Sequence, residues 1–154
     1  MTDREIFSRY LGLPSPAPMG LEIVRAEGIY IYDSEGKEYI DLISGISVSN
    51  TGHRHPVVVK AINYQLDSYL HLNVYGKYIQ SPQVRLARQL TDFLPDNLNS
   101  VFFVNSGSEA IEGAMKLAKR FTGRKEVIAF KNAYHGSTQG ALSILGNETM
   151  KNAF

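Results

Sequence analysis

The stretch from Val101 to Glu112 constrains the fold more than any other part of the sequence. Four apolar residues, 101–104, run directly into Asn-Ser-Gly-Ser, and the pattern of an amphipathic helix begins at once. A buried strand that turns through Ser-Gly-Ser into a helix places several backbone N–H groups and two hydroxyls around one point, which the positive end of the helix dipole faces. The stretch therefore predicts a strand over 101–104, a helix over 108–121 and, between them, an anion site that suits a phosphate.

The composition indicates an α/β globular chain and excludes several other classes of protein. The 154 residues suffice for a core, and 16 basic against 15 acidic residues leave a net charge of +1 at pH 7. This charge gives no argument for nucleic acid or an anionic membrane as a partner. No apolar run approaches the ~20 residues of a membrane span. The charged start, Met1–Ile6, lacks a signal-peptide pattern, and cysteine is absent, so we expect a cytoplasmic protein.

The first half of the chain predicts an arm, a hairpin and two helices. Residues 1–27 begin with a short helical pattern that three prolines interrupt, which predicts an arm followed by irregular chain. Residues 28–43 alternate around a polar, Gly-containing turn and predict a β hairpin. The other predicted elements are helices over 56–72 and 82–94, the second with Ser81 as N-cap, and an aromatic loop over 73–78 between them.

The second half predicts a β-α-β unit. The strand over 101–104 and the helix over 108–121 precede an apolar segment, 126–130, that reads as a second, parallel strand. Because the carboxyl ends of parallel strands meet at one edge of a sheet, Ser106–Ser108 and Tyr134–Gly136 are expected to face the same crevice. The few remaining residues would leave the helices and the sheet edge with little cover, so the sequence is expected to be part of a longer domain.

Three motifs carry candidate chemistry. Ser106 followed by Glu109 can be a plain capping box, and its spacing matches neither a dinucleotide fingerprint nor a Walker A loop. Tyr134-His135-Gly136 alone is typical of a packed loop, but an aromatic ring beside an anion site favours a phosphorylated planar cofactor. His53 and His55, at alternate positions, favour a tight turn into the following helix over a zinc site, because no third ligand stands near them.

Taken together, these motifs resemble the class III pyridoxal-phosphate-dependent aminotransferases, which have fold type I. The resemblance implies an α/β fold whose large domain has three layers around a mostly parallel sheet, incomplete here and preceded by an N-terminal arm and a small β hairpin. Residues 1–50 would belong to the small domain, and 51–154 would form the first part of the cofactor-binding large domain. The matching stretches, in the family's order, are 33–41, 52–56, 102–110 and 134–136.

The resemblance also implies a role for individual residues. Ser106, Gly107 and Ser108 would hold the phosphate of pyridoxal 5′-phosphate, and Tyr134 would stack on its pyridine ring. By the same resemblance, His135 and Gly136 would belong to the cofactor site, and Ile46 and Ser137 would line the substrate pocket. Glu112 matches an acidic position that recurs in the family, but the sequence does not indicate what this residue does.

Two features limit what this chain can do. In the family, the Schiff-base lysine that anchors the cofactor lies downstream of the Tyr-His-Gly motif, and none of the eight lysines here matches it. The 154 residues alone are therefore expected to be inactive. Acetylornithine-, ornithine- and 4-aminobutyrate-type members carry Arg where this chain has Ser137, and Arg can clamp a carboxylate bidentately. Ser137 therefore favours other ω-amines or amino acids as substrates.

For the complete protein, the resemblance implies transfer of an amino group from an amino acid or ω-amine to an oxo acid. It also implies a homodimer with the active site at the interface, to which the N-terminal arm and the 73–78 loop are candidate contributors. Neither nucleic acid nor membrane is an expected partner. An aminomutase or decarboxylase of the same class is an alternative, and so is a non-catalytic cofactor-binding or interaction protein.

Overall fold

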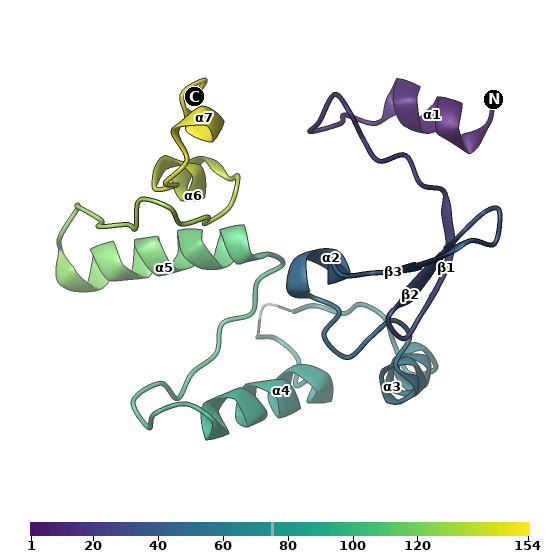
Figure 1. Cartoon of the computed structure of the whole chain (residues 1–154). Coiled ribbons are helices and arrows are strands. Elements are labelled where there is room, and N and C mark those ends of the chain that lie inside the picture. The colour runs from purple at the N-terminus through teal and green to yellow at the C-terminus, as the bar shows by residue number, and fades with distance from the viewer. Residues whose placement is uncertain (75) are drawn as a thin grey trace. The chain divides into compact units, whose positions relative to one another are not determined.

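The computed structural model describes residues 1–74 and 76–154 (Figure 1). Tyr75, in the predicted aromatic loop, lies outside the described residues. The chain divides into two compact units, Met1–Tyr78 and Ile79–Phe154. Among the described residues, no helix is long and apolar enough to cross a membrane.

The first unit contains a three-stranded antiparallel sheet. Its strands are β1 (Ile23–Glu27), β2 (Tyr30–Asp33) and β3 (Glu38–Ile40), in the spatial order β1-β2-β3. The predicted hairpin is confirmed as β2 and β3. The sequence does not predict β1, because Ile-Val-Arg-Ala-Glu lacks apolar alternation. Pairing with β2 forms this strand, and the Arg25 guanidinium lies 4.1 Å from the centre of the Tyr32 ring on that neighbour.

Asp33 builds the hairpin turn. Its Oδ1 accepts hydrogen bonds from the backbone N–H groups of Glu35 and Lys37, at 3.0 and 2.9 Å. Its Oδ2 accepts one from the Tyr39 hydroxyl at 2.8 Å. The Tyr39 hydroxyl is the main reason that the pKa of this carboxyl lies below its ordinary value. One buried carboxylate therefore closes the turn and ties it to β3.

The first unit also holds three helical segments. The predicted helix over 56–72 ends six residues early, at Leu66, and the Gln65 side chain donates to the Tyr69 carbonyl at 2.9 Å just beyond that end. The segment α2 has four consecutive residues with φ between 52° and 64°, so it is a left-handed turn. The bounds are α1 (Asp3–Tyr10), α2 (Ser44–Ser47) and α3 (Pro56–Leu66).

The second unit consists of helices joined by segments without regular secondary structure. The predicted helices over 82–94 and 108–121 are confirmed as α4 and α5, although Gln80, and not Ser81, is the N-cap residue of α4. Figure 1 shows α6 beside α5, with α7 following it. The bounds are α4 (Ser81–Asp92), α5 (Gly107–Thr122), α6 (Gln139–Ser143) and α7 (Glu148–Lys151).

The strands predicted over 101–104 and 126–130 are wrong for this structure. Both segments lack regular secondary structure, and within the described residues no ladder joins them into the predicted parallel pair. A β-strand needs a neighbouring strand to pair its backbone N–H and C=O groups, and these two segments do not pair with each other. Their apolar runs are in part exposed, as Phe102 and Ile128 show. The described residues bury few apolar side chains, namely Ala141, Leu142 and Leu145.

Candidate functional site

The start of α5 presents free hydrogen-bond donors. Ser106, the N-cap residue, is extended (φ −150°), and its Oγ accepts a hydrogen bond from the Glu109 N–H at 3.2 Å. The Glu109 carboxylate accepts from the Asn105 N–H at 2.7 Å, one residue earlier than a capping box requires. Within residues 1–74 and 76–154, the N–H groups of Gly107 and Ser108 and the Ser108 hydroxyl have no partner. These donors, at the positive end of a helix, suit an anion.

Gly136 lies directly against this helix start. It is buried, with φ +126°, and a Cβ added there would stand 2.7 Å from the Ser108 Cβ and closer still to its Oγ. Only glycine allows such a backbone conformation and such a contact together. The structure thus brings the Tyr-His-Gly loop onto the Ser-Gly-Ser segment, although the predicted parallel strands that led to this expectation are absent.

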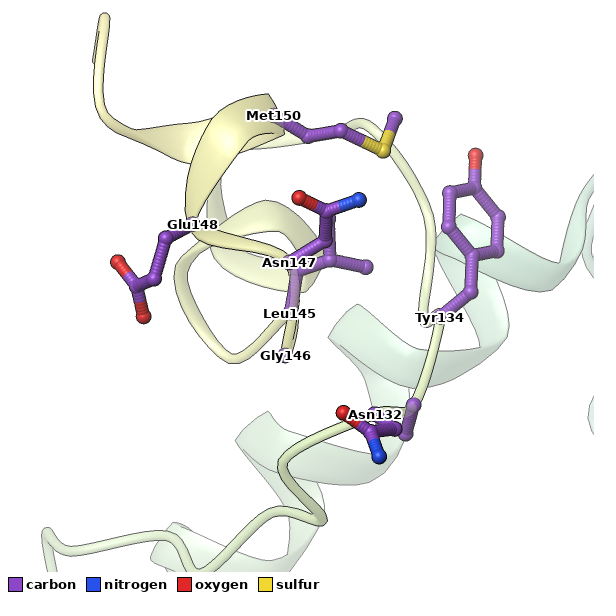
Figure 2. Close-up of a pocket in the computed structure, with 8 residues that line it drawn as sticks. Asn132, Tyr134, Leu145, Gly146, Asn147, Glu148 and Met150 are labelled. Carbon is purple, nitrogen blue, oxygen red and sulfur yellow. The ribbon is translucent and has the colours of Figure 1, made fainter.

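Tyr134 and His135 differ in their surroundings. The Tyr134 side chain is 66% exposed and borders a hollow of about 400 Å³. In Figure 2 the Met150 side chain extends toward the Tyr134 ring, whose hydroxyl points away from the loop. His135 is half-buried, and its Nε2 is enclosed without a hydrogen-bond partner among the described residues. An exposed aromatic ring, an unpartnered ring nitrogen and the free donors of α5 fit a phosphorylated planar group.

Glu112 lies one helical turn after Ser108 on α5. Its Oε1 accepts three hydrogen bonds, from the Thr138 hydroxyl (2.8 Å), the Gly140 N–H (2.8 Å) and the Ala141 N–H (3.2 Å). The Thr138 hydroxyl is the main reason that the pKa of the Glu112 carboxyl lies below its ordinary value. The sequence shows the helical position of Glu112 but not these partners, because they lie 26 or more residues further along the chain.

The remaining predicted site residues are Ser137, in the second unit, and Ile46, in the first. Ser137 lies on the same loop and is exposed. Ile46 belongs to the first unit, where it sits on the left-handed turn α2 with 86% of its surface exposed. Asp41 holds that turn, because its carboxylate accepts from the Ser44 N–H at 2.8 Å and hydrogen-bonds to His53 Nε2 at 2.8 Å. Among the residues that the structure describes, no three His, Asp or Glu side chains converge as metal ligands would.

The free donors at the start of α5 and the loop that lies against them suit a phosphorylated group. A family model for class III aminotransferases matches residues 14–154. The chain therefore belongs to the class III aminotransferase family, as the four sequence motifs predict.

Individual relatives agree with this family. The acetylornithine aminotransferase of Methanopyrus kandleri is 44% identical over 144 residues, which are 93% of this chain and 36% of the relative. Among solved structures, the adenosylmethionine-8-amino-7-oxononanoate aminotransferase of Methanocaldococcus jannaschii matches with a TM-score of 0.90 and 32% identity, over 98% of this chain and 37% of that one. The taurine:2-oxoglutarate aminotransferase of Bifidobacterium kashiwanohense, in complex with PLP and glutamate, matches with a TM-score of 0.85 and 34% identity, over 98% and 34%.

These matches confirm the predicted fold class. The structure is α/β and corresponds to part of the fold type I aminotransferases, including the small antiparallel sheet of the first unit. The chain spans about a third of the length of the three relatives named above, from 34% to 37%.

Proposed function

We propose that the whole protein is a pyridoxal-phosphate-dependent aminotransferase and that this chain supplies the phosphate side of its cofactor site. The observation that carries the proposal is the contact of Gly136 with Ser108, beside the free N–H groups of Gly107 and Ser108. The bound cofactor supplies the electron sink for the carbanion that forms on the amine-bearing carbon of the donor.

The residues of this chain bind and orient the cofactor. The N–H groups at the start of α5 and the hydroxyls of Ser106 and Ser108 hold the phosphate, whose charge the helix dipole stabilises. Tyr134 offers its ring face to the pyridine, and the neighbouring His135 has a buried Nε2 without a hydrogen-bond partner among the described residues. The proton transfers fall to a lysine that this chain does not contain.

The proposed reaction moves an amino group from an amino acid or ω-amine to a 2-oxo acid, in a homodimer whose active site lies at the subunit interface. Ile46 and Ser137 line the substrate pocket in this proposal. The name of the Methanopyrus kandleri relative supports an N-acetylated ornithine donor. Ser137, which cannot clamp a carboxylate as Arg does, supports a different ω-amine. The assignment of 1–50 to a small domain and of 51–154 to a large domain remains part of the proposal.

A donor panel on the full-length protein tests this function. N-acetylornithine, ornithine, 4-aminobutyrate and taurine are each incubated with 2-oxoglutarate, and glutamate is measured with and without added pyridoxal phosphate. Cofactor-dependent glutamate formation with at least one donor supports the proposal. Release of CO₂ or migration of the amine without glutamate would favour a decarboxylase or an aminomutase instead. A Ser137→Arg variant tests the proposed role of Ser137 in the substrate pocket. We expect the new Arg to bind a substrate carboxylate and so to shift the preference toward donors that carry one.

A further inference from the structure

We propose that Glu112 is a positioning residue of the cofactor site, because it fastens the segment after Tyr134-His135-Gly136 along the face of α5 that begins at Ser108. This inference rests on the proposed function. It assigns to Glu112 a role that its place in the sequence leaves open.

Two contacts, one helical turn apart, hold the segment on α5. Ser108 and Glu112 are four residues apart and therefore share one face of the helix. Gly136 and Gly140 are also four residues apart, and each lies against one of these two side chains. A Cβ at position 140 would stand 2.7 Å from Glu112 Oε1, just as a Cβ at position 136 would collide with Ser108. The segment 136–140 thus touches the helix at both positions. A Cβ at position 136 would meet the Ser108 Cβ and backbone, and one at position 140 would have to displace the Glu112 carboxylate.

The hydrogen bonds of Glu112 replace a cap that α6 does not make for itself. Thr138 is the N-cap residue of α6, but its side chain makes no capping hydrogen bond within that helix. The Thr138 hydroxyl instead donates to Glu112, and so do the N–H groups of Gly140 and Ala141. A carboxylate on α5 therefore satisfies the free donors at the start of α6. This arrangement fixes the distance between the two helices.

The hydrogen bonds of Glu112 matter for the proposed cofactor site because Gly136 and Ser108 lie at the centre of that site. If the Glu112 contact is released, the Gly136–Ser108 contact is the one of these two that remains. The loop can then move away from the free donors of α5, and Tyr134 moves with it. A glutamate carboxyl is ionised at neutral pH, and the Thr138 hydroxyl lowers the pKa of Glu112 below its ordinary value. All three hydrogen bonds are therefore charge-assisted.

The test compares Glu112→Ala with Glu112→Gln in the full-length protein. All three donors meet one oxygen, Oε1, so a glutamine oxygen in the same place can accept all three. Pyridoxal phosphate is titrated and its visible circular dichroism is recorded. We expect Glu112→Ala to bind the cofactor about tenfold more weakly or worse, with reduced dichroism, and Glu112→Gln to stay within about threefold of wild type. Asp92→Ala, which removes only an exposed ion pair with Arg88 on α4, is the matched control and should bind as wild type does.

The outcomes separate this inference from the proposed function. If wild type binds no pyridoxal phosphate, the proposed function fails and the inference with it. If wild type binds it and Glu112→Ala binds equally well with unchanged dichroism, the inference alone is overturned. Should Glu112→Ala not fold, Thr138→Val and Thr138→Ser decide, since the first removes one of the three donors and the second keeps it. Weaker binding by Thr138→Val but not by Thr138→Ser supports the role of Glu112, and equal binding by both contradicts it.

Discussion

At the residue scale, the proposed cofactor site depends on a glycine at the contact between the loop and α5. Gly136 combines a positive φ with a contact against Ser108 that leaves no space for a Cβ. Either feature alone disfavours other residues, and together they make the loop sensitive to the smallest possible substitution.

Gly136→Ala is expected to weaken the binding of pyridoxal phosphate by at least about tenfold, because the new Cβ must push the loop off Ser108 or strain the backbone. Gly36→Ala is the matched control. Gly36 also has a positive φ (81°), but a Cβ there meets nothing within 4 Å. Both variants should lose some thermal stability, measured by the unfolding midpoint. If the two variants bound the cofactor equally well, the contact between Gly136 and Ser108 would not contribute to cofactor binding.

Ser106 allows capping and phosphate binding to be separated. Its Oγ accepts from the Glu109 N–H, so Ser106→Ala should lower the free energy of unfolding of the cofactor-free protein by about 1 kcal/mol. Ser106→Asp keeps a capping oxygen but adds a negative charge where the phosphate is proposed to bind. We expect this variant to unfold like wild type in urea and yet to lose affinity for pyridoxal phosphate. Retained affinity in Ser106→Asp would place the phosphate elsewhere.

At the element scale, the left-handed turn α2 is the segment that most needs outside support. Three of its four residues carry side chains, and a left-handed conformation costs such residues about 1–2 kcal/mol each. Asp41 offsets part of this strain through its hydrogen bonds to the Ser44 N–H and to His53. The turn exposes Ile46, the residue proposed for the substrate pocket.

The pH dependence of stability should report on Asp41. The Ser44 N–H, followed by His53, lowers the pKa of this carboxyl below its ordinary 3.8. Because the folded state favours the ionised form, the stabilisation is complete above that ordinary value and is lost as pH falls through the lowered one. Unfolding midpoints of wild type and Asp41→Asn should therefore differ most at pH values above that ordinary pKa and converge as pH falls below it. A difference that grows as pH falls would contradict this account.

Elements governed by local chemistry could be predicted from the sequence, whereas those that need distant partners could not. Asp33 makes its turn bonds within four residues to the backbone, and the hairpin was predictable for that reason. The Ser106–Glu109 pattern likewise marks the start of α5. The apolar run 101–104 predicts a strand, but a strand depends on a neighbour that the run does not specify. The partners of Glu112 lie too far along the chain for spacing to reveal them.

At the scale of the whole molecule, much apolar surface of this chain faces solvent. Examples from the second unit are Phe121 on α5 at 88% exposure and Ile128 at 100%. Chains that expose this much apolar surface associate or bind other apolar molecules. We expect the whole protein to cover these side chains.

The 154 residues, produced alone, should therefore bind the dye ANS strongly, and the full-length protein should bind little of it per mole. Sedimentation of both samples measures their oligomeric state as a second test, because we expect the 154-residue chain to self-associate. Weak dye binding by the 154 residues as a monomer would show that the chain buries its apolar faces without the rest of the protein.

In the proposed function, the start of α5, with Gly136 against it, binds the phosphate of pyridoxal phosphate. The most direct measurement is a titration of the full-length wild-type protein with pyridoxal phosphate and, in parallel, with pyridoxal, which lacks the phosphate. Two or more charge-assisted hydrogen bonds of about 1.5 kcal/mol each predict at least a roughly hundredfold preference for the phosphorylated form. Equal affinity for the two compounds would contradict the claim.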